Sequence, residues 1–444
     1  MKKILLILII LLLAVNAYSQ GGRESEPDSI EEQDLISEAA DSDYDEFDEE
    51  AEEDKTFRIG DRNWEIGLVN FNIGVANNLL KISEVFNKDR KVYIDLERLN
   101  EGFNMGLFVN VRPVFFNVNF DGEWGFGFDF ARITAYGNVE IAGSLLNMNK
   151  SDGEDFGAGG AAFVEIGIPG FFHINDIGGK DLRINVKLSP YVTAFYTKPE
   201  MKYSLREVNG ENGRSLMMVI DYGVKVYTPF SLDPEADMLS SLDIGKAVGF
   251  DLSLGAEYPL FDFLDLGVNF SNIPIVPSRL SNYMQIKDRI VMDTTKIDLF
   301  GGSDEDKEDF ITIPEDTETV YGNDKDNPLF YRPFKLVFYA NYRPFKFNFP
   351  LLTVIPRLGL MVSEIYVRPV SLEAGVFFRC DLSNMFITTL GINYEDQMWK
   401  NSLDLVLNLR AFELAIGAAM QSQDFVMSWQ GSGLLINFGI KFGW

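Results

Sequence analysis

The chain has almost no cysteine or histidine. Cys380 is the only cysteine and His173 is the only histidine among 444 residues. A single cysteine cannot form an internal disulfide, and one histidine with one cysteine cannot supply the nitrogen and sulfur ligands of a zinc site. The sequence therefore excludes a disulfide-stapled secreted domain and predicts neither a metal nor any other cofactor.

Long hydrophobic runs are also absent after the first twenty residues, which excludes a protein that crosses a membrane with helices. Residues 1–19 carry two lysines, an unbroken apolar run from Ile4 to Val15, and then Ala17-Tyr18-Ser19. These are the three regions of a secretory signal peptide, with cleavage expected after Ser19. The alternative is an N-terminal membrane anchor, which is disfavoured because the run is short and an acidic stretch follows it.

Basic residues are scarce in residues 20–56. Between positions 21 and 54, seventeen Asp or Glu residues accompany Arg23 as the one basic residue. Such a segment repels itself and has little apolar surface to bury, so we expect disorder, with a cation-binding or partner-binding tail as the alternative. The formal net charge of the chain is −28, which excludes nucleic acid as a partner.

From residue 57 to residue 444 the apolar residues recur with a period of two. For example, Leu182, Ile184, Val186 and Leu188 alternate with polar residues. Alternate residues of a strand share one face, so each such segment has one apolar and one polar face. The same alternation occurs at residues 103–111, 124–130, 250–258 and 402–410.

Two all-β architectures produce this pattern. A soluble sandwich buries its apolar faces between two sheets, whereas a transmembrane barrel turns them toward lipid and keeps the polar faces inside. Many segments reach the length of a tilted membrane strand, and aromatic residues gather at their ends. We therefore predict an all-β fold, a transmembrane antiparallel up-and-down β-barrel of about 14 strands, with 16 as the alternative.

Connections of two lengths are expected between these strands. Short turns are predicted at residues 381–384 and near Asp262, as at the periplasmic end of a barrel. Longer polar insertions are predicted at residues 301–327 and 207–214, as on the outside. The acidic part of the longer insertion was weighed as a Ca²⁺ site, but it lacks the glycine of the EF-hand spacing.

The C-terminal segment is an amphipathic strand that ends on an aromatic residue. Asn437, Gly439, Phe442 and Trp444 occupy the fixed positions of a pattern that runs polar, any, Gly, two of any kind, aromatic, any, aromatic. This segment resembles the signal by which the barrel-assembly machinery recognises outer-membrane proteins. The resemblance implies that machinery and outer-membrane lipid as partners, and the outer membrane of a diderm bacterium as the location.

Two further stretches, residues 251–260 and 270–277, resemble strands of divergent spirochaete members of the long-chain fatty-acid transporter superfamily. The resemblance implies a fourteen-stranded barrel plugged at its N-terminus that moves hydrophobic molecules. The chain departs from that family in one respect. The Asn-Pro-Ala motif of the family's N-terminal hatch is missing, and the acidic segment stands in its place.

Enzyme chemistry finds no support in the sequence. A serine hydrolase needs a histidine base, and the one histidine is not accompanied by a G-x-S-x-G elbow. We therefore expect a protein that is not an enzyme and has no catalytic residues.

The leading functional hypothesis is a transport barrel for uptake of small, hydrophobic molecules, whose identity the sequence does not give. The alternatives are a general diffusion porin and a surface-exposed structural or adhesive protein. Charges on the polar phase of the strands are candidates to face the lumen and set selectivity, or to pair across strands and fill it. The candidates are Arg132, Arg183, Lys187, Asp251, Glu257, Arg357, Arg379, Asp404 and Arg410.

Overall fold

The structure is a computed structural model, and its described residues belong to one compact unit, Thr56–Trp444. No helix in the described part of the chain is long and apolar enough to cross a membrane. The expected signal peptide and acidic segment, most of residues 301–327, and Arg410 lie outside the described residues. The described ranges are 62–78, 102–120, 122–142, 156–210, 213–237, 240–293, 311–312, 318–326, 328–344, 351–366, 368–383, 385–409 and 411–444.

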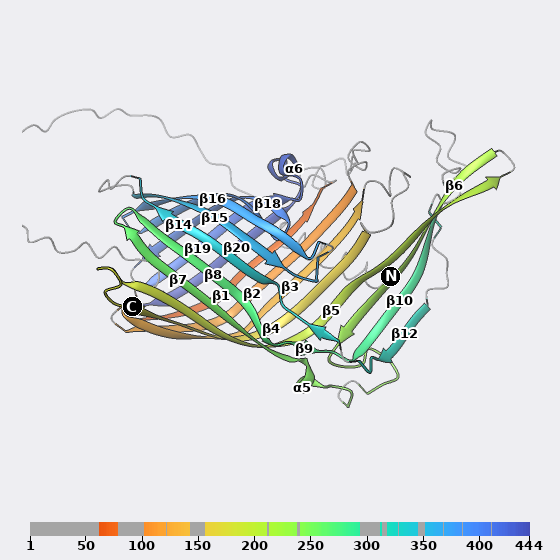
Figure 1. Ribbon diagram of the computed structural model, residues 1–444, viewed down its shortest axis with the longest axis horizontal. Helices are drawn as coiled ribbons and strands as arrows, with labels where there is room; N and C mark the ends of the chain where they lie inside the picture. The colour runs from red at the N-terminus through yellow and green to blue at the C-terminus, as the bar shows by residue number, and fades with distance from the viewer. Residues whose placement is uncertain are drawn as a thin grey trace, which may run out of the picture. The chain divides into compact units, whose positions relative to one another are not determined.

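Fourteen antiparallel strands of the described chain pair in sequence order and close into a barrel (Figure 1). The closing pair joins the first strand to the last, from Glu65 opposite Gly443 to Val75 opposite Leu434. This confirms the predicted fold class and the choice of fourteen strands over sixteen. The strands are β1 (Trp64–Asn77), β2 (Gly102–Phe120), β3 (Trp124–Ala142), β4 (Phe156–Ile174), β5 (Leu182–Gly210), β7 (Val248–Phe261), β8 (Leu264–Val276), β14 (Phe334–Tyr342), β15 (Leu351–Val362), β16 (Val370–Leu382), β17 (Phe386–Glu395), β18 (Met398–Leu409), β19 (Phe412–Ser422) and β20 (Leu434–Gly443).

The apolar phase of each strand forms the exterior of the barrel. On β16, for example, Val370 and Leu372 are 57% and 70% exposed, whereas the intervening phase carries Glu373, which is 6% exposed. Large apolar side chains exposed around a closed barrel need lipid against them, because such a continuous apolar surface is unfavourable in water. The exterior is therefore that of a membrane barrel.

Short turns lie at the same end of the barrel as the C-terminus. Connections lie at both expected places, between β7 and β8 and between β16 and β17, but the second begins later than expected, because Asp381 and Leu382 still belong to β16. Ser383 in this connection adopts a positive φ of 56°. At the opposite end most connections are longer, apart from the two-residue turn between β17 and β18, and they contain two short helices, α5 (Ile244–Ala247) and α6 (Phe425–Trp429). Both helices begin at an aspartate, Asp243 or Asp424, whose carboxylate accepts a hydrogen bond from the first turn.

One expected loop is a strand hairpin instead. Residues 207–214 were predicted to be an insertion, but β5 continues to Gly210 and pairs with β6 (Gly213–Thr228) from Tyr196 onward. The prediction was wrong because strand pairing can continue beyond the membrane, where apolar alternation is no longer required. This hairpin extends into a sheet with β10 (Asn282–Asp293), β11 (Ile311–Thr312) and β12 (Glu318–Asn323), as Figure 1 shows for β6, β10 and β12.

The C-terminal strand β20 lies between β19 and β1. Phe442 and Trp444 are exposed on the apolar exterior, whereas Gly439 is buried on the opposite face. Asn437 also points inward, where its amide donates to the carboxylate of Asp404 at 2.5 Å. The four residues of the expected assembly signal are thus divided between the two faces of one strand.

Candidate functional site

A cavity of about 500 Å³ lies within the lumen, against the wall formed by β1–β5, β7 and β8. A second cavity of about 390 Å³ adjoins it, because both are lined by Asn110, Arg112, Arg132, Pro169 and Lys187. Aromatic rings also line the larger cavity, among them those of Phe108, Tyr136 and Phe171. The charged residues that line it are Arg62, Glu65, Arg112, Arg132, Arg183, Lys187 and Arg332.

A bulge in β3 brings two of the charged residues of this wall to the same face. The pairing of β3 with β4 shifts register between Asp129 and Arg132, and Ala131 between them has a φ of 48°. A bulge inserts one residue and so reverses the phase of the strand beyond it. Asp129 and Arg132 therefore both face the lumen, although strict alternation assigns them to opposite faces.

Three carboxylates beside the cavity are almost completely buried and lie among basic side chains. Asp129 accepts from Nε of Arg112 at 2.9 Å, and the ammonium group of Lys187 lies 3.7 Å from its other oxygen. Glu165 accepts from both Lys187 and Arg332. Because a buried carboxylate is costly without a partner, this network fixes the positions of the basic residues.

Asp251 completes this network at its deepest point. It is 0% exposed, and Oδ2 lies 3.5 Å from Nη1 of Arg332. Neither oxygen of Asp251 has a hydrogen-bond partner among the described residues, and neither does Nη1 of Arg332. The guanidinium thus uses Nη2 for Glu165 and holds Asp251 by charge alone.

Arg332 comes from a segment that folds into the lumen at the end of the barrel opposite the C-terminus. Just before it, β13 (Leu329–Phe330) pairs with β9 (Ser278–Arg279) in a two-stranded sheet of its own. Phe330 is completely buried, and its ring centroid lies 4.4 Å from that of Tyr196 and 5.0 Å from that of Tyr227. An apolar cluster therefore fills the lumen on this side of the charged network.

The β15–β16 connection crosses the lumen at the same end. Ile365 is completely buried, and its carbonyl lies so close to Gly159 of β4 that a Cβ there would approach the oxygen to 1.9 Å. Arg368 binds the carboxylate of Glu140 on β3 at 2.8 Å. Since β15 and β16 stand across the barrel from β3 and β4, the loop closes this end. We call residues 329–333, 363–366 and 368–369 together the plug.

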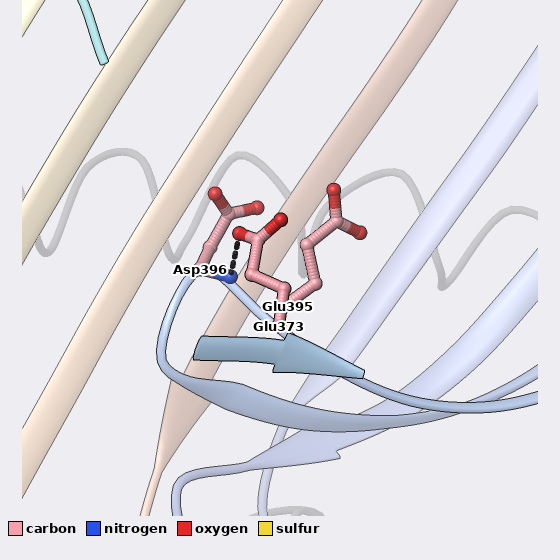
Figure 2. Close-up of side chains that lie close together, drawn as sticks. All are labelled: Glu373, Glu395 and Asp396. Atoms are coloured by element: carbon pink, nitrogen blue, oxygen red, sulfur yellow. Dashed lines mark hydrogen bonds between the residues drawn. The ribbon is translucent and has the colours of Figure 1, made fainter. Parts of the chain in front are cut away.

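Near the plug, three carboxylates gather around one ammonium group. The side chains of Glu373, Glu395 and Asp396 point in the same direction, and the backbone N–H of Asp396 donates to Glu373 at 3.2 Å (Figure 2). Such a cluster could hold a metal ion. The ammonium group of Lys335, however, lies 3.2, 2.9 and 2.8 Å from the three carboxylates, so the ligand atoms are already used and a metal does not fit.

The charge on Asp396 depends on these partners. Asp396 lies in the turn between β17 and β18, and burial alone would raise the pKa of its carboxyl. The ammonium groups of Lys335 and Lys400, at 2.8 and 3.1 Å, outweigh the burial and hold that pKa below its usual value.

The candidate lumen charges fall into distinct groups. Arg132, Arg183 and Lys187 line the larger cavity, and Asp251 lies beneath Arg332. The others contact residues that do not line it. Glu257 accepts from the hydroxyl of Tyr339 at 3.0 Å, Arg357 stacks 4.4 Å above the ring of Phe377, Arg379 lies 3.5 Å from Asp381, and Asp404 accepts from Asn437.

Four charged residues of the network were not singled out from the sequence. Arg112, Asp129 and Glu165 lie within strands, and their polar character between apolar neighbours was a usable signal. Arg332 lies in a connection, where no periodicity exists to indicate which way a side chain points. His173 lies next to the last residue of β4, with its ring centroid 6.0 Å from that of Phe171.

No family model matches the chain, and no curated protein matches it. Among solved structures, the chain is similar to the toluene transporter TbuX of Ralstonia pickettii, with 8% identity, 86% of this chain and 90% of that chain covered, and a TM-score of 0.41. The chain is also similar to the toluene transporter TodX of Pseudomonas putida, with 11% identity, 87% of this chain and 90% of that chain covered, and a TM-score of 0.37. For a FadL homologue of Pseudomonas aeruginosa the identity is 9%, the covered shares are 86% of this chain and 90% of that chain, and the TM-score is 0.38. The narrower resemblance to spirochaete members, expected from the sequence, finds no support in these comparisons.

Proposed function

We propose that this chain is an outer-membrane transport barrel that takes up small molecules with an apolar body through a plugged lumen. The observation that carries the proposal is the arrangement of the plug above the cavity of about 500 Å³. A cavity of this size encloses a small solute, and a solute must displace or pass the plug to cross the barrel.

The apolar body of the solute is proposed from the lining of the cavity. Phe108, Tyr136 and Phe171 supply aromatic surface among the polar groups. Binding sites commonly combine such apolar contact with a few placed polar groups that orient the ligand. The outer-membrane location is supported by the apolar exterior of the barrel, since closed barrels are the strand-built solution to a lipid environment.

The plug argues against free diffusion. Phe330 and Ile365 are completely buried, and the two connections that carry them occupy the lumen at one end. An open porin needs a continuous water-filled channel, whereas a site that must open for each solute gives saturable transport.

The test is the flux of a panel of small neutral, anionic and cationic solutes out of proteoliposomes that contain the full-length protein. We expect flux that saturates with concentration for a subset of the solutes, together with low ion conductance in planar bilayers. Flux that rises linearly for every small solute, with large stable conductance steps, would establish a general porin. A folded barrel with no flux of any solute would favour a structural or adhesive role.

A further inference from the structure

The charge of the larger cavity is strongly one-sided. Among the described residues, six basic side chains line it, and Glu65 is the one acidic residue of that lining. The charges of three of the six are compensated, because Arg112, Lys187 and Arg332 form ion pairs with the buried carboxylates of the network. The remaining three, Arg62, Arg132 and Arg183, differ from them in this respect.

These three arginines are held by neutral groups. Arg62 donates to the side chain of Asn408 at 2.6 Å, and Arg132 donates through Nε to Asn110 at 3.0 Å. Arg183 lies 4.5 Å above the ring of Phe171. Within the described part of the chain, no carboxylate lies within 4.0 Å of any of the three guanidinium groups. Amide oxygens and a ring orient a guanidinium but do not cancel its charge.

Among the three arginines, Arg132 has the most closely defined position. It lies where the two cavities meet, beside Arg112 and Lys187, which line both cavities with it. Its Nε is engaged by Asn110 on β2, which fixes the plane of the guanidinium and leaves both terminal nitrogens without a hydrogen-bond partner among the described residues. A planar fork of N–H donors matches the two oxygens of a carboxylate or the edge of a phosphate.

Positive charges confined in a partly dehydrated lumen are unfavourable unless an anion accompanies them. Water and mobile counterions in a cavity of about 500 Å³ compensate these charges only diffusely, whereas a bound oxyanion compensates them at close range. The same excess of charge raises the local concentration of anions and lowers that of cations. The cavity is therefore selective by charge as well as by shape.

We propose that the cavity binds its solute through an oxyanion group, a carboxylate or a phosphate, with Arg132 as the principal contact and Arg183 as a second contact nearer the short-turn end. The inference rests on the proposed function and adds the chemical class of the solute to it. Arg112 and Lys187 contribute mainly by their field, because Asp129 and Glu165 already occupy their hydrogen bonds.

The test compares benzoate with benzamide by isothermal titration calorimetry on the purified full-length protein. The two probes have nearly the same shape, and only benzoate carries a negative charge. We expect benzoate to bind at least tenfold more tightly, with an affinity that falls as the ionic strength rises. Inorganic phosphate serves as a third probe, which separates the oxyanion from the aromatic body.

Arg132→Gln is the decisive variant, and Arg379→Gln is its matched control. Arg379 is an inward-facing arginine on β16 that does not line the cavity. We expect Arg132→Gln to weaken benzoate or phosphate about tenfold or more, Arg132→Lys to weaken it less, and Arg379→Gln to leave it unchanged. Heat-modified mobility on gels checks that each variant forms a barrel.

Equal binding of benzoate and benzamide, or no binding of either benzoate or phosphate, would overturn the inference. So would unchanged binding in a folded Arg132→Gln barrel. Each of these results leaves saturable flux of other solutes intact, so the failure of the oxyanion site is distinguishable from the failure of the transport function. Loss of flux for every solute in the panel would instead refute the transport function.

Discussion

The guanidinium of Arg332 binds the carboxylate of Glu165, although 167 residues separate them in the chain. Arg332 belongs to the plug, and Glu165 belongs to the cavity wall on β4. One ion pair therefore connects the element that closes the lumen to the network that positions the basic residues below it. Anything that weakens this pair acts on closure and on the cavity together.

We predict that Arg332→Met opens the lumen. The change leaves Asp251 without its basic neighbour and removes one of the two basic partners of Glu165. Removal of one member of a buried ion pair costs about 3–5 kcal/mol, much of it from the charge left behind. The plug should therefore detach more often, and single-channel recordings should show larger and more frequent conductance steps than those of the wild type.

Arg279→Met is the control for this prediction, because Arg279 lies in β9, which pairs with β13 just before Arg332, and its side chain is exposed. Its recordings should match those of the wild type. Restored closure in the triple variant Arg332→Met, Glu165→Gln, Asp251→Asn would show that the unpaired carboxylates, rather than the lost volume, cause the opening. If a folded Arg332→Met barrel shows no conductance steps, the ion pair between Arg332 and Glu165 does not hold the lumen closed.

Much of the barrel follows from the sequence, because every strand must turn apolar residues to lipid and polar residues inward. Alternation at Leu182–Leu188 or Leu403–Leu409 locates strands, and closure of the ring follows from the need to satisfy strand edges in lipid. Alternation does not locate a bulge. The reversal at Ala131 depends on pairing with two neighbours, and no local signal predicts it.

The site was less accessible to prediction than the fold. Arg132, Arg183 and Lys187 were found because strand charges stand out against an alternating pattern. Whether such a charge lines a cavity or pairs across the lumen depends on what the connections place inside the barrel. Arg332 and Ile365 come from connections, whose side chains follow no period, so the plug could not be derived from the sequence.

We predict that Gly159→Ala displaces the β15–β16 connection. A Cβ at this position would lie 1.9 Å from the carbonyl oxygen of Ile365, and a backbone atom cannot move aside as the end of a flexible side chain can. The loop must shift, so the variant should bind benzoate more weakly and unfold at a lower urea concentration. Gly137→Ala on β3 is the control, since its Cβ would meet nothing closer than 3.5 Å.

The two glycine variants differ in what they test. Both add the same methyl group to a barrel strand, on the lumen face for Gly159 and on the exterior face for Gly137, so any general effect of alanine on strand stability is common to them. If the urea midpoint of unfolding is lower for Gly159→Ala and unchanged for Gly137→Ala, the contact with Ile365 is supported. Equal midpoints and equal binding would show that the loop does not press on β4 in solution.

We predict a loss of stability in acid that depends on Asp396. Its folded-state pKa is below the ordinary value for a carboxyl, because Lys335 and Lys400 outweigh the effect of burial. A lowered pKa contributes stability that is fully present above about pH 4 and is lost as the pH falls through the folded value. The urea midpoint of the wild type should therefore decrease below about pH 4.

In Asp396→Asn, this contribution is absent at every pH. The free energy of unfolding at pH 7 should be lower by about 1–3 kcal/mol, and the decrease in acid should be shallower than in the wild type. Asp262→Asn is the control, because the side chain of Asp262 is 81% exposed and lies in a turn. Parallel acid profiles for the wild type and Asp396→Asn would exclude Asp396 as a source of the acid sensitivity.

We predict that the exterior aromatic residues of β20 act in assembly more than in stability. The tilted rings of Phe442 and Phe412 pack together at a centroid distance of 5.4 Å, and both Phe442 and Trp444 face the exterior. If the assembly machinery reads these residues, Phe442→Ser with Trp444→Ser should greatly reduce the amount of folded barrel in the outer membrane. Phe425→Ser, at an equally exposed phenylalanine on α6, should not.

Refolding in detergent separates recognition from stability, because purified protein then folds without the machinery. Loss of one aromatic contact costs roughly 0.5–1.5 kcal/mol beyond the buried area, which is small for a barrel closed by fourteen paired strands. The double variant should therefore refold in detergent to nearly the wild-type yield, despite its poor accumulation in cells. Poor refolding in detergent as well would mean that these residues hold the closing strand in place, and normal accumulation in cells would remove the assembly signal altogether.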